Sequence, residues 1–197
     1  MNYLTSHQML NDTFRSLSKK VLINSKPQDA IVTTAYLGAV EKRHISSLES
    51  FYQGDYVEHE GRTFLVTEEV ETRRHNKFRA TMTHCNYYFT ASNPPIKVDT
   101  GLKDDFGKPI YSYTEVDSTY LYCVVSEIER SIVTTGGMSL AKATFFIDIQ
   151  ESVSNKKLFA VNSEHVFKGK NVKVIGQDIN QNGRLGIEMQ IGLDSPT

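Results

Sequence analysis

Apolar and polar residues alternate with a period of two along much of the chain, which is the pattern of half-buried β-strands. The clearest case is residues 54–67, where two short runs flank Glu60-Gly61. Gly61 can adopt the positive φ that a tight hairpin turn requires. The flanking apolar and aromatic residues suit a half-buried pleated surface: Tyr56, Val57, Phe64, Leu65 and Val66. We therefore predict a β-hairpin over 54–67, around which the rest of the chain is organised.

A different period marks the N-terminus. Leu10, Phe14 and Leu17 recur at positions i, i+4 and i+7, which predicts one face of a short amphipathic helix. Thr5 followed three residues later by Gln8 predicts a capping box at its start.

Further strand-like runs follow, separated by turn residues. Val21–Ile23 and Ala30–Tyr36 predict a first hairpin across residues 24–29, and residues 79–89 predict one continuous strand that ends at Asn93-Pro94-Pro95. Residues 41–53 are compatible with either a helical turn or a wide connection. The later expected strands are 120–125, 143–149, 158–161, 171–176 and 184–191, with a hairpin across Asn182-Gly183. This spacing predicts a mainly β fold, an antiparallel sandwich or barrel, in a single domain spanning 1–197.

Residues 93–118 interrupt this pattern. They contain three of the five prolines, two glycines and the acidic pair Asp104-Asp105. Connections of this length in a compact domain are usually functional or mobile, and tyrosines offer a large contact area at a low cost in conformational entropy. We predict a long protruding loop or arm that contacts other subunits through Val98, Ile110, Tyr111 and Tyr113.

Composition narrows the class of protein. The 22 basic and 23 acidic residues give a net charge of −1, so no overall field attracts nucleic acid or an anionic membrane. Cys85 and Cys123 are too few for a disulfide scaffold and match no zinc or redox spacing, so we expect reduced core thiols. Residues 1–8 lack the features of a signal peptide, and no apolar run is long enough to cross a bilayer; we expect synthesis in the cytoplasm and no membrane partner.

Candidate chemistry is sparse. Residues 178–183 match the first half of an EF-hand calcium loop, but Met189 stands where the bidentate acid should be, so we expect a plain hairpin turn and no metal or other cofactor. The six histidines show no paired ligand spacing, and Gly136-Gly137 lacks the Lys-Ser/Thr of a phosphate loop. We therefore do not expect an enzyme.

One basic run carries an alternative function. Its four cations could contact phosphates: Arg73, Arg74, Lys77 and Arg79. The aromatic residues 87–89 would then supply a stacking platform of the kind found in single-strand-binding β-barrels. The simpler interpretation is that the acidic residues just upstream pair with these cations across a turn: Glu68, Glu69 and Glu71.

The central hairpin also carries a family likeness. The pattern Gly54-Asp55-x-Val57-x-x-x-Gly61-x-x-x-Leu65-Val66, followed by Cys85-Asn86, resembles small β-rich virion proteins of tailed phages that infect Gram-positive bacteria. The likeness covers residues 18–92. It implies a head-tail connector or head-closure component of the neck and brings no catalytic residues with it. The residues after Asn93 match no part of the family pattern and make this chain longer than the small head-closure barrels.

The resemblance implies a structural virion protein, made in the host cytoplasm, that forms a homo-oligomeric ring in the neck. Its expected partners are the neighbouring portal, neck or tail proteins, with DNA passing through the ring lumen. The alternative is a cytoplasmic single-strand nucleic-acid-binding β-barrel that uses the basic run.

Overall fold

The computed structural model describes residues 7–38, 40–73, 77–91, 96–103, 106–114, 118–135, 138–178 and 182–191. The protein is mainly β, as the sequence predicts, with antiparallel barrel-like sheets and two short helices in the described residues. By its internal contacts the chain divides into two compact units, residues 1–87 with 122–197 and residues 88–121. The second unit contains the arm expected at 93–118, and the assignment of the whole chain to one domain stays a prediction.

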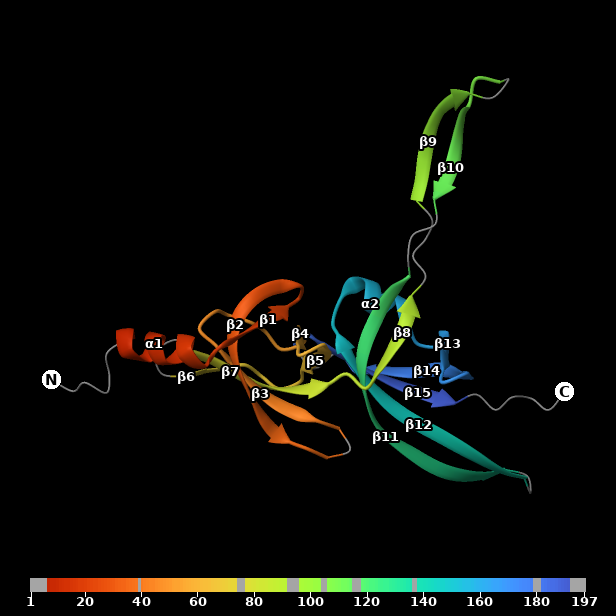
Figure 1. Ribbon diagram of the computed structural model, residues 1–197. Helices are drawn as coiled ribbons and strands as arrows, with labels where there is room; N and C mark the ends of the chain where they lie inside the picture. Colours follow the sequence, from red (N-terminus) through yellow and green to blue (C-terminus); the bar gives the residue numbers. More distant parts are fainter. Residues whose placement is uncertain are drawn as a thin grey trace. The chain divides into compact units, whose positions relative to one another are not determined.

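The N-terminal part of the larger unit is a closed antiparallel barrel (Figure 1). Six strands follow one another in the order β3-β2-β1-β4-β5-β7, and β7 pairs with β3 to close the sheet. Closure pairs the strand edges that an open sheet would expose. The elements are α1 (His7–Leu17), β1 (Lys19–Ile23), β2 (Lys26–Tyr36), β3 (Lys42–Ser47), β4 (Tyr56–His59), β5 (Arg62–Val66), β6 (Glu71–Arg73), which pairs with β7, and β7 (Lys77–His84).

The predicted helix and first hairpin are confirmed, with different details. Phe14 of α1 is buried, whereas Leu17, expected on the same face, is 62% exposed. The β1–β2 turn consists of Asn24 and Ser25 alone, both with positive φ (46° and 65°), so β2 begins at Lys26 and not at the expected Ala30. Two consecutive left-handed residues are what a tight hairpin between right-twisted strands requires.

The hairpin at 54–67 is confirmed, but its second strand is not half-buried. β4 pairs with β5 across Glu60 and Gly61, which have φ values of 52° and 74°. Phe64, Leu65 and Val66 are all fully buried. Phe64 and Val66 face the barrel core. Leu65 packs on the outer side of the barrel against Val124, which belongs to the second sheet. Both faces of β5 are therefore covered.

Two other expectations for this region are wrong. The stretch 41–53 contains strand β3, which neither the helical turn nor the wide connection anticipated; it pairs with the preceding strand β2 and with the distant strand β7. The strand expected over 79–89 is broken at Cys85-Asn86 into β7 and β8 (Tyr87–Ala91), which belong to different sheets. At the break the Asn86 side-chain amide bonds both backbone groups of Val125, at 2.9 Å (Nδ2 to O) and 2.8 Å (N to Oδ1).

The second large sheet has the strand order β13-β14-β15-β12-β11-β8. Its two ends approach each other, because the Tyr87 ring lies 4.5 Å from that of Phe167 and its hydroxyl accepts a bond from Lys168 N at 3.1 Å. The added elements are β11 (Thr119–Thr135), β12 (Met138–Gln150), α2 (Val153–Leu158), β13 (Glu164–Phe167), β14 (Lys170–Asp178) and β15 (Arg184–Ile191). The core is built from Phe145, Ile147, Ile149, Phe159, Val172, Val174, Leu185, Ile187 and Met189.

The predicted pair 171–176 and 184–191 is confirmed as the hairpin β14–β15. The strand expected at 158–161 is wrong, because these residues form the end of α2 and the turn that follows it. Ser152 caps α2 by accepting a bond from Asn155 N, and Phe159 is buried beneath the turn. The apolar run thus reflects a buried turn and not an alternating strand. β11 and β12 are also much longer than expected and stay paired as far as Thr135 and Met138.

Within the larger unit, the barrel and the second sheet are joined by specific contacts. The Tyr56 hydroxyl donates to Tyr122 O at 2.6 Å and accepts from Gln150 N at 3.3 Å, and its burial raises the pKa of the phenol. Gly54 and Gly183 both have positive φ and approach so closely that a Cβ on either would overlap the backbone carbonyl of the other turn. Both positions therefore require glycine.

The thiols of Cys85 and Cys123 are free and buried, as the sequence predicts. Burial raises the pKa of Cys85 to about 12 and that of Cys123 further still. Neither described helix has the length and apolar character that a bilayer crossing demands.

Candidate functional site

The arm expected at 93–118 is a β-hairpin and not an irregular loop. β9 (Ile96–Lys103) and β10 (Pro109–Thr114) pair antiparallel as a two-stranded sheet of their own. The sequence prediction failed because it took proline and glycine as evidence against strands. Pro109 stands at the first position of β10, and Gly101 adopts a φ of 70° within β9. A free two-stranded ribbon tolerates both.

The predicted contact residues share this hairpin but not one face of it. Tyr111 pairs with Asp99, whereas Val98 pairs with Ser112, and successive positions of a strand point to opposite faces. Val98 and Tyr111 are 43% and 40% exposed. The two faces of the ribbon therefore each present at least one of the expected contacts to solvent.

The other two predicted contacts are placed only by their backbone. Tyr113 pairs with Lys97, two positions from Tyr111, and Ile110 lies at the register shift between Pro109 and Tyr111. The side chains of Ile110 and Tyr113 lie outside the described residues.

Every side chain that the structure describes in the hairpin and its connection is exposed. Phe106 and Leu102 show this most strongly, at 90% and 64% exposure. In the same unit Tyr88 and Tyr120 form an edge-to-face pair at 5.1 Å and are themselves about half exposed, at 51% and 57%. Phe89 is the one buried side chain among those described in this unit, so the hairpin has no visible core of its own.

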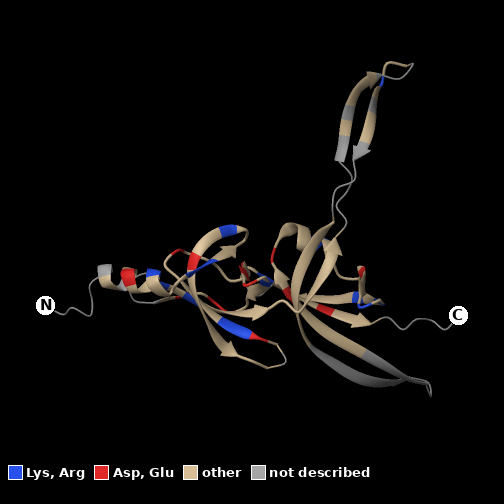
Figure 2. Ribbon diagram, viewed as in Figure 1, with Lys and Arg blue, Asp and Glu red and all other residues tan. Residues whose placement is uncertain are grey.

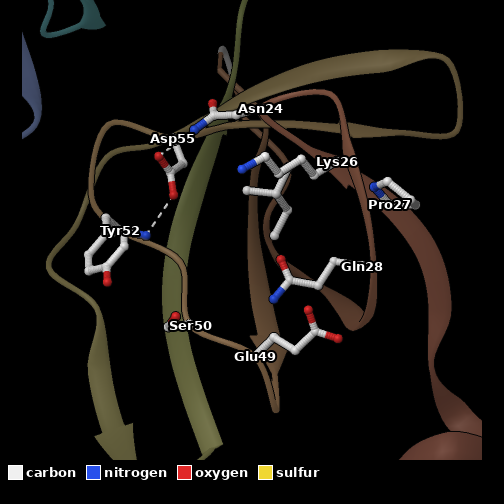
Figure 3. A pocket seen from close by; sticks show the side chains of 9 residues that line it. Asn24, Lys26, Pro27, Gln28, Glu49, Ser50, Tyr52 and Asp55 are labelled. Atoms are coloured by element: carbon white, nitrogen blue, oxygen red, sulfur yellow. Dashed lines mark hydrogen bonds between the residues drawn. The ribbon is translucent and has the colours of Figure 1, made fainter.

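A second candidate site is an open groove of about 520 Å³ on the barrel, between the β1–β2 turn and the connection from β3 to β4 (Figure 3). Asn24 and Asp55 build one wall. Asn24 Nδ2 donates to Asp55 Oδ1 at 2.7 Å, Tyr52 N donates to Asp55 Oδ2 at 2.7 Å, and Asn24 Oδ1 accepts from Tyr56 N at 3.0 Å. These bonds hold the wall rigid and use the polar groups of its residues.

Two charged side chains of the groove, Lys26 and Glu49, are available for a partner. Lys26 and Glu49 lie at opposite ends with Gln28 between them (Figure 3). Gln28 is buried and donates to Ser47 Oγ at 3.2 Å, whereas Lys26 and Glu49 are exposed and neither forms an ion pair with any described residue. The exposed Tyr52 ring forms part of the rim. The groove thus combines the apolar residues Ile23 and Pro27 and the aromatic Tyr52 with one free charge of each sign.

The basic run at 73–79 does not form a basic face in the described residues. Lys77 lies with its ammonium 5.7 Å from the Phe14 ring, and Arg79 sits directly opposite Glu71 in the β6–β7 pairing. Arg79 also lines a small cavity together with Glu68, Glu69 and Glu71. Figure 2 shows acidic and basic residues interspersed over the barrel strands. This arrangement matches the simpler interpretation, in which the acidic residues neutralise the run.

The other parts of the nucleic-acid hypothesis are not brought together. Arg74 and the side chain of Arg73 lie outside the described residues. Of the expected stacking platform, Phe89 is buried and Tyr87 bonds Lys168, which leaves Tyr88 exposed. These aromatics are on β8, in a different sheet from Lys77 and Arg79. Single-strand binding stays a prediction without geometric support.

A charge network that the sequence analysis missed lies around the β4–β5 turn. Glu41 accepts from Arg43 Nε at 2.6 Å and from Arg62 Nη1 at 2.8 Å, and Glu60 accepts from Lys19 Nζ at 3.0 Å. Arg43 Nη1 also lies 3.5 Å from Glu60. These residues are spread over three strands and two turns, so no local sequence signal could have revealed the network.

Two histidines adjoin this network: His59 is buried and His84 is half-buried. His59 lies 3.6 Å from Glu60, and the His84 ring makes an edge contact with Phe64 at 5.4 Å, while Arg43 lies over that same Phe64 ring. Burial lowers the pKa of both histidines, and nearby arginines act in the same direction. Both rings therefore pack against neighbouring side chains, His59 beside Glu60 and His84 against Phe64.

No group of three potential metal ligands gathers anywhere in the described part of the chain. The turn considered for calcium includes residues 179–181, which lie outside it. The expectations that the protein binds no calcium and is not an enzyme stay predictions.

Comparison with known proteins gives a match to a family model. Residues 2–84 match the model of a family described as the YomX N-terminal domain, which is phage-associated. The match associates this part of the chain with phages. It covers less than half of the 197 residues and extends from the N-terminus to the end of β7, so that it spans α1 and the barrel. No curated protein and no solved structure matches the chain.

Proposed function

We propose that this protein is a structural component of a tailed-phage virion, in the head-tail neck, where it self-associates into a ring and acts by packing and not by catalysis. Two findings support the proposal. The barrel matches a phage-associated domain. The resemblance of residues 18–92 to neck proteins, read from turn and strand residues, covers nearly the same part of the chain.

The observation that carries the proposal is the hairpin β9–β10, in which every described side chain is exposed. A two-stranded hairpin is at best marginally stable in water, because it cannot bury enough apolar surface on its own. Val98, Leu102 and Phe106 would each contribute roughly 1.5–3 kcal/mol if a partner buried them fully. An exposed ribbon of this kind is therefore best explained as an element that is stabilised on assembly.

The barrel and the hairpin suit different roles in such an assembly. A closed barrel offers few free strand edges for uncontrolled pairing, whereas a two-stranded ribbon offers two. When one element of a subunit binds a different surface of the next subunit, the contact is heterologous and closes into a ring if the rotation allows. A rigid barrel with a separate contact arm fulfils both requirements.

Deletion of residues 97–112 tests the proposal. The deleted protein should melt within a few degrees of the intact chain, because the removed segment contributes no buried side chain that the structure describes. It should no longer form rings in negative-stain microscopy or sediment as an oligomer. As a milder pair, Tyr111→Ala should weaken association, whereas Tyr36→Ala, which removes a 59% exposed tyrosine from the barrel, should leave it unchanged. Rings formed by the deleted protein would refute the assignment of the arm.

A further inference from the structure

We propose that the groove between the β1–β2 turn and the β3–β4 connection receives the β9–β10 arm of a second copy of this chain. This inference rests on the proposed self-association and names the surface that accepts the arm. The groove, at about 520 Å³, is within the range of volumes that bind a ligand or a few side chains. Ile23 is among the residues that line it, and Tyr52 and Pro27 lie on its two sides (Figure 3).

Charge complementarity selects the arm as the occupant. The groove carries Lys26 and Glu49 at opposite ends, and neither has an ion-pair partner among the described residues. On β9, Lys97 and Asp99 occupy alternate positions, which share one face of a strand about 6.8 Å apart. An arm laid along the groove can therefore set Asp99 against Lys26 and Lys97 against Glu49.

The same face of the arm supplies the apolar part of the contact. Asp99 pairs with Tyr111 and Lys97 with Tyr113, so both predicted tyrosines accompany the two charges. Tyrosines at the centre of an interface commonly contribute much of its binding energy, while charges at its rim determine orientation and the choice of partner. The face opposite, which includes Val98, is left for a further contact.

The contact is heterologous, because arm and groove are different parts of the chain. Each copy offers one of each, so successive copies can link head to tail into a closed ring. This is the symmetry that the proposed function requires.

Paired charge exchanges test the inference without changing the net charge. The groove exchange is Lys26→Glu with Glu49→Lys, and the arm exchange is Lys97→Asp with Asp99→Lys. Each exchange alone should weaken association by about tenfold, as expected for two rim pairs turned from attraction to repulsion. The control exchange is Lys20→Glu with Asp29→Lys, two exposed residues that face each other across β1 and β2 outside the groove. It should have no effect on association.

Mixing decides whether the arm reaches another copy. In an equimolar mixture of the groove-exchange and arm-exchange proteins, each arm finds a complementary groove on the other protein. Sedimentation velocity should then show oligomers restored to the intact level.

If neither exchange changes association while deletion of 97–112 abolishes it, the groove is not the receiving surface, although the proposed function stands. If the mixture fails but a chain carrying both exchanges recovers, the arm occupies its own groove and the inference is overturned. If the deletion itself leaves assembly intact, the proposed function fails with it.

Discussion

Leu65 offers a direct test of how the barrel and the second sheet depend on each other. Its side chain is fully buried, yet it points away from the barrel core and packs with Cys85 and Val124. Leu65→Ala should lower the free energy of unfolding by about 2–5 kcal/mol, the range for a leucine truncated in a closed core. Phe64→Ala, on the opposite face of β5, should cost a similar amount, about 3–5 kcal/mol. Nearly equal losses are the signature of a strand buried on both sides.

A double-mutant cycle isolates the contact across the junction. Leu65 and Val124 share one cluster, so Leu65→Ala and Val124→Ala should be non-additive, with a coupling of about 0.5–3 kcal/mol. Val172 is equally buried but belongs to the core of the second sheet, so Leu65→Ala and Val172→Ala should add within about 0.5 kcal/mol. Urea unfolding followed by circular dichroism measures both pairs. Additivity of the Leu65 and Val124 changes would refute the view that the two sheets form one packed body.

Three further outcomes are expected. Gly61→Val should lower the melting temperature by several degrees, because its positive φ strains a β-branched residue by about 1–3 kcal/mol. A Cβ at this position meets no atom within 4 Å, so no steric clash adds to this loss. An unchanged melting temperature would contradict the turn assignment. Burial lowers the pKa of His84 below its unfolded value of 6.5. The contribution of His84 to the free energy of unfolding should therefore be fully present above pH 6.5 and be lost as the pH falls through the folded pKa. His84→Gln should flatten this loss when unfolding is measured as a function of pH. Calorimetry should detect no micromolar calcium site, and a site that disappears in Asp178→Ala would overturn the hairpin interpretation.

Local sequence patterns predicted the hairpins because each depends on a few adjacent residues. Glu60-Gly61 and the alternation of β14 and β15 are readable without knowledge of the rest of the chain. The break between β7 and β8 was not, since it depends on the amide of Asn86 bonding Val125, 39 residues away. The long β11–β12 ribbon could have been found from Gly136-Gly137, a strong two-residue turn signal between β-rich runs.

The position of the arm in the chain was predictable from the sequence, but the surface that it presents was not. The arm was located by its unusual composition, but the opposite faces of Val98 and Tyr111 follow from a pairing register that composition does not contain. The groove is assembled from residues that precede β3 in the sequence and residues that follow it. Lys26 and Glu49 are recognised as free charges only once the structure shows that neighbours such as Asn24 and Asp55 bond to each other. The position of Glu71 opposite Arg79 was predictable, because the two residues lie close by in sequence and in the same hairpin.

The two-sided burial of β5 also sets an order of events during synthesis. All the strands of the barrel have been made once His84 is added. Leu65, however, is covered only after Val124 has been added, and Val124 follows Cys85 by 39 residues. At about 5–20 residues per second, the nascent barrel exposes this apolar side chain for roughly 2–8 s. Slow translation over residues 86–124 should therefore increase aggregation of the nascent chain, and Leu65 is the position at which a polar substitution would reduce that aggregation at the expense of the finished fold.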